Sequence, residues 1–405
     1  MTERPWRSAL LAALLWALSG PLLAAKPAAP APAKAGARVL ELAVVGVADD
    51  PRYLPRRLEK RWPGQSLGRL LGAAQLSAED AQLELEQAQL QLRVQDAQAP
   101  SSAELGALLQ QLGSRKVGVW LLDLPDALMP QALQAAQAAQ ALAINASSSA
   151  DALRAQACRS AVLHTLPSQA MLADALAQFL AAHQWRQALL LHGGHADDAA
   201  LLQAWQRAAK RYGISHTDTR RFKFSTDPRE REAANPRLLS AERRHDAVLV
   251  WDSEGEFARA LPYNTQQPRP VLGSNGLVAL AWHPLWERYG GPQLNRRFSK
   301  RAQRPMSGQD WAAWVGVKAV VSAWVAAPEA TPVQLSQRLR AGGVPIDGFK
   351  GLPLSVRPWD GQLRQPVLLG HADGVAATAP VEGVLHPTDT LDTLGLEEKE
   401  SACKR

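Results

Sequence analysis

Two patterns of apolar residues alternate along most of this chain. Short runs that are almost wholly apolar are separated by longer stretches in which apolar residues recur every three or four positions, as at Leu105, Leu108, Leu109 and Leu112. The first pattern is typical of strands in a parallel sheet covered on both faces, and the second is typical of helices. In the first series the pattern predicts strands at 39–47, 89–94, 116–122 and 141–144, and helices at 67–87, 101–113 and 126–140.

The same alternation then begins again. It predicts helices at 168–180, 197–212, 254–261, 307–327 and 332–340, and strands at 188–191, 221–224, 246–251 and 270–272. Two successive series of strands and helices predict an α/β fold class with two doubly wound, Rossmann-like lobes rather than one continuous sheet.

A hairpin is predicted near the end of the chain. Asp360-Gly361 lies between two β-rich runs, and this dipeptide favours a two-residue turn in which both positions have φ > 0. Pro358 and Pro366 cannot donate to a strand ladder, so they restrict these strands to an edge or to strand ends. We therefore expect an edge hairpin after the last helix.

The first 25 residues have the pattern of an export signal. Arg4 and Arg7 precede an apolar run at 8–20, and small residues follow at 24–25. The run is shorter than the roughly 20 residues that span a bilayer, although a short membrane anchor is the alternative interpretation. Residues 26–37 form an alanine-proline linker without enough apolar surface to fold. We expect a mature protein outside the cytoplasm.

The formal net charge of +7 and a pI near 9.6 raise the question of an anionic partner. The basic residues are scattered, and acidic residues interrupt most runs; the densest basic cluster lies at 296–304. We interpret these positions as solvated helix faces and expect no nucleic-acid partner. An anionic ligand or partner is the alternative.

The chain has two cysteines, Cys158 and Cys403. In an oxidising compartment such a pair is a disulfide candidate, which would join the polar tail at 391–405 to the body of the protein. Two free thiols are the alternative.

The tryptophans are numerous, and three of them, Trp311, Trp314 and Trp324, fall on the helix predicted at 307–327 together with several valines. This spacing favours a buried helix face over a ligand cage.

Motifs of common catalytic and nucleotide sites are absent from the sequence, including GxSxG, the Walker loop, HExxH, CxxC and GxGxxG. Their absence favours a binding protein without a cofactor or a metal over an enzyme. Catalytic triads are assembled in space rather than in sequence, so an enzyme with an unrecognised site is the alternative.

Candidate ligand-binding residues follow the carboxyl ends of predicted strands, where open α/β sheets bind ligands. The hydroxyls of Ser147, Ser148 and Ser149 could hold an oxyanion or cap a helix. His195 lies in a glycine-containing loop and could contact ligand; a metal site with His192 is the weaker interpretation. Trp251, Asp252 and Ser253 combine an aromatic surface with a carboxylate, or a packed ring with a helix cap. Asn275 lies in the polar loop Gly273–Gly276.

Taken together, these features resemble periplasmic solute-binding proteins of the branched-chain amino acid (type I) superfamily. Several segments are similar to the subfamily associated with pyrroloquinoline-quinone-dependent alcohol catabolism. They are Cys158, His164–Ser168, Met171–Leu176, Asp310–Trp314, Gly348–Gly351, Arg357–Pro366 and Glu400–Cys403.

The resemblance implies two lobes joined by a three-crossing hinge, with ligand in the cleft between them. It divides the chain into a signal at 1–25, a linker at 26–37, a first lobe at 38–164 plus 283–345, a second lobe at 165–282 plus 346–390, and a tail at 391–405. It also implies a periplasmic monomer that delivers a small molecule to the permease subunits of an ABC importer. An envelope sensory or regulatory protein with the same fold is the alternative.

The resemblance also bears on the ligand. Ser147–Ser149 match a loop that holds the ligand carboxylate in amino-acid-binding members. Asn275 stands where those members carry the acid that pairs with the ligand ammonium, and Asp123 stands where a serine contact is expected. A buried ammonium without a counter-charge is costly, so we expect a small polar or anionic solute rather than a plain amino acid, unless Asp252 or Glu254 substitutes for that acid.

Overall fold

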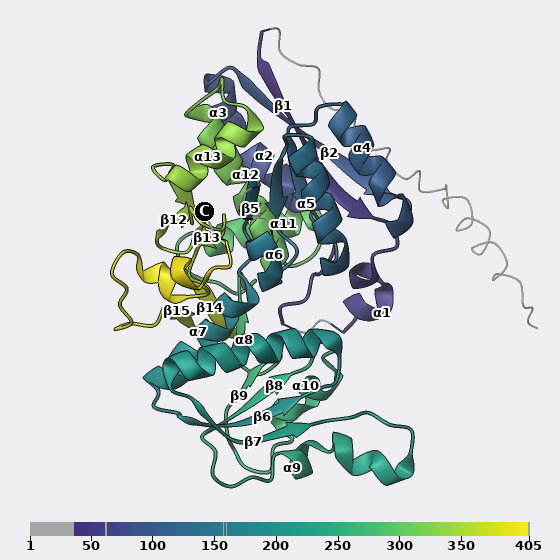
Figure 1. Cartoon of the computed structure of the whole chain (residues 1–405), viewed down its shortest axis with the longest axis vertical. Helices are drawn as coiled ribbons and strands as arrows, with labels where there is room; N and C mark the ends of the chain where they lie inside the picture. Colours follow the sequence, from purple (N-terminus) through teal and green to yellow (C-terminus); the bar gives the residue numbers. More distant parts are fainter. Residues whose placement is uncertain (1–35, 61–62, 157, 159, 404–405) are drawn as a thin grey trace, which may run out of the picture. The chain divides into compact units, whose positions relative to one another are not determined.

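The first series of elements folds into a parallel five-stranded sheet with the order β2-β1-β3-β4-β5 (Figure 1). The computed structural model describes residues 36–60, 63–156, 158 and 160–403; the predicted export signal and most of the linker lie outside this range. The strands of the sheet are β1 (Arg38–Val47), β2 (Leu90–Ala99), β3 (Val119–Leu122), β4 (Leu142–Asn145) and β5 (Val162–His164). The four strands predicted in this region are confirmed.

Alternate residues of β1 enter different hydrophobic clusters, which shows that both faces of this sheet are covered. Leu42 and Val44 pack with α2, α11, α12 and α13, whereas Ala43 and Val45 pack with α4 and α5. Figure 1 shows α4 and α5 beside the sheet. Because side chains of a strand point alternately to opposite faces, a near-continuous apolar run is what such a sheet requires.

The second series forms a parallel four-stranded sheet with the order β7-β6-β8-β9. Its strands are β6 (Gln187–His192), β7 (Ser215–Arg221), β8 (Ala247–Trp251) and β9 (Val271–Gly273). The strand predicted at 221–224 is wrong, because the true strand β7 is polar and lies at the sheet edge. Phe222 follows β7 and stacks on Phe257 at 4.1 Å between ring centroids.

The helices agree with the predicted series except at 67–87 and at four helices that were not predicted, α1, α6, α9 and α11. The stretch predicted as one helix at 67–87 is two helices, α2 and α3, and α11 was not predicted because few of its residues are apolar. The helices are α1 (Pro55–Leu58), α2 (Leu71–Asp80), α3 (Gln82–Gln87), α4 (Leu105–Ser114), α5 (Met129–Ala138), α6 (Asp151–Gln156), α7 (Gln169–Ala182), α8 (Ala196–Tyr212), α9 (Pro236–Leu239), α10 (Glu256–Ala260), α11 (Gly291–Ala302), α12 (Gly308–Val325) and α13 (Pro332–Ala341). Within the described residues, none of these helices is long and apolar enough to cross a membrane.

Two predictions about helix faces are confirmed. Trp311, Trp314 and Trp324 are buried in α12, and Trp311 stacks on Trp282 with 6.0 Å between ring centroids. In the basic cluster of α11, Arg297 and Arg301 form ion pairs with acidic residues of α2. These charges therefore lie on a helix surface and are partly neutralised.

The predicted hairpin is confirmed, but its turn differs from the prediction. Strands β12 (Pro353–Val356) and β13 (Leu363–Arg364) are antiparallel, and β11 (Ile346–Asp347) pairs with β12 on the other side. The loop is closed by a bond from Arg357 N to Gln362 O of 2.9 Å, so it holds four residues rather than two. Gly361 has φ +74, whereas Asp360 is not left-handed and accepts from Gln362 N through its carboxylate.

A second small sheet joins β10 (Val278–Leu280), β14 (Val367–His371) and β15 (Gly374–Ala379). It packs with the cluster around β6 and β8, whereas β11 and β12 pack with the cluster around β1. The chain therefore passes between the two main clusters at three places, at residues 165–168, 280–281 and 365–366. We refer to these places as the crossings.

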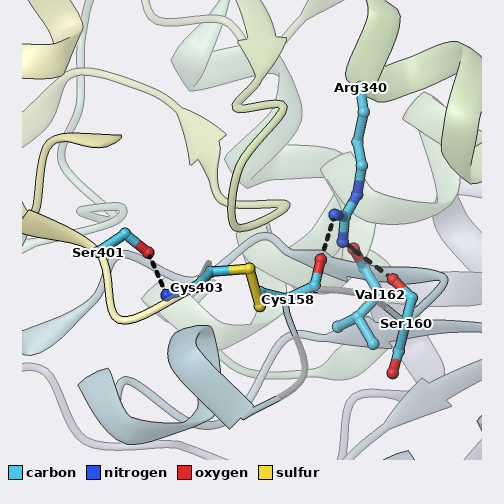
Figure 2. The surroundings of a disulfide bond; sticks show 6 residues. All are labelled: Cys158, Ser160, Val162, Arg340, Ser401 and Cys403. Atoms are coloured by element: carbon cyan, nitrogen blue, oxygen red, sulfur yellow. Dashed lines mark hydrogen bonds between the residues drawn. A yellow bond between two sulfur atoms is a disulfide. The ribbon is translucent and has the colours of Figure 1, made fainter. Parts of the chain in front are cut away.

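The structure joins Cys158 and Cys403 in a disulfide, across a sequence separation of 245 (Figure 2). Cys158 lies between α6 and β5. Arg340 of α13 donates to the carbonyl oxygens of Cys158, Ser160 and Val162 at 2.7, 3.0 and 2.9 Å, as Figure 2 shows. The C-terminal tail is thus held to the first half of the chain by a covalent bond.

Candidate functional site

A pocket with a cavity volume of about 220 Å³ lies at the carboxyl ends of β8 and β9. The segment between α1 and α2 contributes Pro63 and Gly64, and the other lining residues come from elements of the second series. The described residues that line it are Pro63, Gly64, Gln169, Leu172, Ala173, Leu176, Leu201, Trp251, Asp252, Ser253, Gly273, Ser274, Val278 and Ala279. The walls are mostly apolar and the polar groups are few.

Three of the predicted site residues, Trp251, Asp252 and Ser253, line this pocket together. The Asp252 carboxylate accepts three backbone N–H groups at the start of α10, from Glu254, Gly255 and Ala258, at 3.1, 2.9 and 2.9 Å. Burial raises the pKa of this carboxyl, while the bonds from the helix lower it. Asp252 therefore acts as a helix cap, one of the two interpretations that its sequence context left open.

Two polar atoms of the lining residues have no hydrogen-bond partner in the part of the chain that the structure describes. They are Nε1 of Trp251 and Oγ of Ser253, and both atoms are buried. The backbone of Ser253 is well anchored, because its N–H donates to Asp198 Oδ1 at 2.7 Å. The Trp251 ring packs near Trp205, with 6.2 Å between ring centroids. The Trp251 ring and the Ser253 backbone are thus held in place, while the indole N–H and the hydroxyl have no partner among the described residues.

The serine loop does not belong to the pocket lining. Ser147 Oγ is engaged with the backbone of Leu122 and Leu124, and Ser148 Oγ accepts from Ala150 N. Ser149 is joined to the pocket only indirectly, since its carbonyl accepts from the backbone N of the lining residue Gln169 at 2.8 Å. Ser147 thus holds the segment that follows β3, and Ser148 bonds the backbone directly before α6, so both hydroxyls are engaged within the protein.

His195 and Asn275 also lie outside the lining. His195 is exposed and occupies the N-cap of α8. Asn275 donates its side-chain amide to the carbonyl oxygens of Ala258 and Arg259 at 3.1 and 3.4 Å, so it closes the end of α10. The predicted site residues are therefore only partly brought together by the fold. Within the described residues, no group of three metal-ligating side chains occurs.

Sequence reasoning missed the apolar wall of the pocket. Leu172, Ala173 and Leu176 come from α7, and Leu201 comes from α8. Helix α7 is apolar on nearly every side, which is a weak signal that it touches something besides one core. An ordinary core helix has the same pattern, so the sequence could not separate the two cases.

Asp123, at the carboxyl end of β3, is the centre of a buried charge network. Its carboxylate accepts from Tyr53 Oη at 2.5 Å, from Arg69 Nε at 2.8 Å and from Arg52 Nη2 at 3.1 Å. Burial and the negative charge of Asp123 raise the pKa of the Tyr53 hydroxyl, which keeps it protonated as a donor. The cations at this strand end are therefore already paired, so they offer little to a ligand.

The two halves of the chain also meet beside the pocket. Arg57 of α1 contacts Glu254 Oε1 at 3.4 Å and the carbonyl oxygen of Ser253 at 3.4 Å. Glu254 therefore has a cationic neighbour from the first half of the chain. This contact lies next to Ser253, which lines the pocket.

No family profile and no curated protein matches the sequence. Solved structures match in three dimensions. A periplasmic binding protein from Burkholderia mallei has a TM-score of 0.65 at 13% identity, over 90% of this chain and 98% of that chain. A branched-chain amino acid ABC transporter periplasmic ligand-binding protein from Burkholderia xenovorans LB400 has a TM-score of 0.66 at 13% identity, over 84% and 95%. An ABC transporter solute-binding protein from R. palustris, in complex with benzoate, has a TM-score of 0.63 at 11% identity, over 91% and 100%.

At these identities the similarity shows the fold. The chain has the two-lobe α/β fold of type I periplasmic binding proteins, with parallel sheets in both lobes. Two of these three neighbours are described as ligand- or solute-binding proteins of ABC transporters and one as a periplasmic binding protein, and each differs from this chain at more than four in five aligned positions.

Proposed function

We propose that this protein is a periplasmic solute-binding component of an ABC-type importer and that it holds a small molecule in the pocket at the ends of β8 and β9. The observation that carries the proposal is the composition of the lining, which joins Pro63 and Gly64 of the first series to residues of the second series. A ligand that contacts both halves stabilises the arrangement in which they approach each other. The position of the pocket also follows the rule that open α/β sheets bind ligands beyond the carboxyl ends of their strands.

The hinge of this mechanism is formed by the crossings at 165–168, 280–281 and 365–366. Rotation about a few residues at such places is a common form of closure around a ligand. The packing of Ile346, Leu354 and Val356 with the cluster around β1 supports assigning residues 346–364 to the first lobe. We otherwise keep the division expected from the sequence, with the tail beginning at 391.

The similar segments of the sequence, among them Asp310–Trp314 and Arg357–Pro366, support a role linked to pyrroloquinoline-quinone-dependent alcohol catabolism. The pattern of residues 1–25 supports export by a cleaved signal to the periplasm. The proposed partners are a small-molecule ligand and the permease subunits, and the proposed binding unit is a monomer without enzymatic activity. An envelope sensory or regulatory role with a protein partner is the second candidate, because one fold serves several functions.

Thermal unfolding in the presence of small molecules tests the solute-binding function. A ligand that binds only the folded protein raises the melting temperature by an amount that grows with its concentration. We expect a saturable rise with at least one compound from a panel of alcohols, aldehydes, carboxylates and amino acids. The absence of any shift, together with recovery of an envelope protein in a pull-down, would favour the sensory role.

A pocket-filling variant connects the shift to the site. Leu172→Trp places a larger side chain in the lining and should abolish the shift, because the cavity is small. Ala182→Trp, at an exposed position in the last turn of the same helix, is the matched control and should leave the shift intact. Equal shifts in both variants would place the ligand elsewhere.

A further inference from the structure

The chemical class of the ligand can be inferred from the polar groups around the pocket, an inference that rests on the proposed solute-binding function. The carboxylates nearest the pocket are engaged within the protein. Asp252 accepts three backbone N–H groups of α10, and Glu254 lies beside Arg57. Neither carboxylate is arranged to receive a ligand ammonium, and the amide of Asn275 is turned to the end of α10. The sequence left open an amino-acid ligand whose ammonium would pair with Asp252 or Glu254. The bonds that these two carboxylates make within the protein do not support such a ligand.

The described residues of the lining offer no positive charge either. Among them Asp252 is the one ionisable residue, and no lysine, arginine or histidine occurs. Moving a carboxylate or an ammonium out of water without a counter-charge is strongly unfavourable. An apolar pocket of this kind discriminates against charged ligands of either sign.

Two residues of the lining nevertheless carry a donor group without a partner among the described residues. Trp251 is 6% exposed and its indole N–H is unpartnered, and so is the buried hydroxyl of Ser253. Leaving a buried polar group unsatisfied destabilises a protein, so native structures rarely keep such groups without a reason. Trp Nε1 is only a donor and a serine hydroxyl can donate, so a hydrogen-bond acceptor would satisfy both.

We propose that the pocket selects a small uncharged molecule with an apolar body and one oxygen acceptor, the chemistry of an alcohol, an aldehyde or a ketone. The apolar body packs against Leu172, Leu176 and Leu201. The oxygen accepts from Trp251 Nε1 and Ser253 Oγ. A dry cavity of roughly 150 Å³ lined by apolar side chains can bind benzene, so a cavity of about 220 Å³ has room for a ring with a short substituent. This class differs from the polar or anionic solute expected from the sequence, because the lining places no cation in the pocket.

A matched series of ligands tests the class. Titration calorimetry compares benzyl alcohol and benzaldehyde with benzoate and benzylamine, and the corresponding hexyl compounds extend the comparison to a flexible chain. We expect the uncharged members to bind at least about tenfold more tightly than the charged members of the same series. Equal or tighter binding of a charged member would overturn the inference and leave the solute-binding function standing. If neither these compounds nor a broad panel of metabolites binds, both proposals fail.

Two variants test the donors. Trp251→Phe keeps an aromatic ring but removes the N–H, and Ser253→Ala removes the hydroxyl. Each should weaken binding of the best uncharged ligand by about tenfold, since a ligand oxygen loses one of two donors. Ser114→Ala, at an exposed helix end away from the pocket, should leave the affinity unchanged. Unaltered affinity in both pocket variants, measured on protein that melts cooperatively, would contradict the assigned donors.

Discussion

Buried polar side chains beside the crossings and at the pocket differ in their hydrogen bonding, as Gln362 and the pair Trp251 and Ser253 show. At the crossings, Gln362 Nε2 donates to the carbonyl oxygens of His164 and Leu166 at 3.0 and 3.1 Å, and its Oε1 accepts from Arg154 Nε at 3.0 Å. At the pocket, the indole N–H of Trp251 and the hydroxyl of Ser253 have no partner. Both regions are buried, but the amide of Gln362 is bonded within the protein, whereas the two donors of the pocket residues have no partner among the described residues.

Buried side chains at the third crossing are also bonded within the protein. Lys350, which is buried, donates to Gln365 Oε1 and to the carbonyl oxygen of Pro366, each at 2.8 Å, and its ammonium lies 3.7 Å from the centre of the Trp311 ring. Gln365 in turn donates to Thr165 O at 2.7 Å and so links two crossings. Burial lowers the pKa of Lys350 well below its ordinary value. The bonds of Lys350 and Gln365 thus join the backbone of the first crossing to that of the third crossing.

This difference teaches how to separate structure from function among buried polar residues. Buried side chains that bond to one another within the protein help to specify the fold, and replacing one of them should lower the free energy of unfolding. A fixed donor without a partner costs stability as it stands, and its presence favours a role in binding. Substitutions in the two regions should therefore differ in their effect on stability.

Replacing Arg357, the buried cation that binds residues 392 and 394 near the end of the chain, should have the largest effect on the free energy of unfolding. Arg357 is 1% exposed and donates to Asp392 Oδ1 at 2.7 Å and to Leu394 O at 2.6 Å. Arg357→Met should lower the free energy of unfolding by about 3–5 kcal/mol, because it removes one of the two arginines that pair with the buried Asp392 carboxylate, Arg364 being the other, and leaves a buried carbonyl oxygen without its donor. Urea unfolding measures the change, and Arg115→Met at a half-exposed position is the control. A loss no larger than that of the control would mean that the bonds of Arg357 are not a structural network.

Removing the disulfide between Cys158 and Cys403 should have the second-largest effect on stability. Cys158→Ser combined with Cys403→Ser should lower the free energy of unfolding by about 2–5 kcal/mol, because the bond closes a long loop and restricts the unfolded chain. Chemical denaturation with and without a reducing agent measures the change, and the double variant should no longer respond to reduction. A wild-type protein that is insensitive to reduction while its disulfide is cleaved would contradict the prediction.

The stability of the protein should depend on pH through His164, which lies directly before the first crossing. Burial, together with the positive charges of Arg154 and Arg340, holds the pKa of this imidazole well below its ordinary value. The unfolded chain takes up a proton below about pH 6.5 while the folded ring stays neutral, so stability present above that pH is lost on acidification, by about 1.4 kcal/mol per pH unit.

His164→Gln tests this assignment, since it removes a titrating group from the same place. Urea unfolding between about pH 7.5 and pH 5 should give a smaller slope for the variant than for the wild type. Other histidines whose pKa burial lowers, such as His216 and His283, contribute equally to both proteins. Parallel curves would show that His164 is not held neutral by the fold.

A pair of serine variants should give the smallest effect and the sharpest contrast. Ser168 caps α7, where its Oγ accepts from Met171 N at 3.2 Å, so Ser168→Ala should cost about 1 kcal/mol. Ser253→Ala removes a hydroxyl that has no partner and should change stability by less than about 0.5 kcal/mol or increase it. Equal losses in both variants would remove the distinction between the pocket and the network.

Much of the fold could be predicted from the sequence. The apolar runs of β1, β3, β4, β6 and β8 are visible because each strand is buried on both faces and must be apolar throughout. The Trp-rich helix α12 is recognisable for the same reason. Strand β7 and helix α11 were missed because their residues are largely polar, and local pattern alone does not show which neighbours cover them.

The candidate site was less predictable. The rule about strand ends led to Trp251, Asp252 and Ser253, but it led equally to Ser147, Ser148, His195 and Asn275, which the fold uses for caps and loop closures. The apolar wall from α7 and α8 carries no motif. Short polar residues after a strand suit both a ligand and a helix end, so their types do not distinguish these roles.

The amino-acid pattern by itself determined two parallel sheets, their covering helices, the late hairpin and the pairing candidates Cys158 and Cys403. Each of these depends on local periodicity, turn chemistry or residue counting, which are properties of the chain in order. Only the tertiary structure decided which buried polar atoms found partners. Gln362 bonds to His164 across almost two hundred positions of sequence, while Trp251 Nε1 has no partner among the described residues, because a hydrogen bond depends on distance and direction in space.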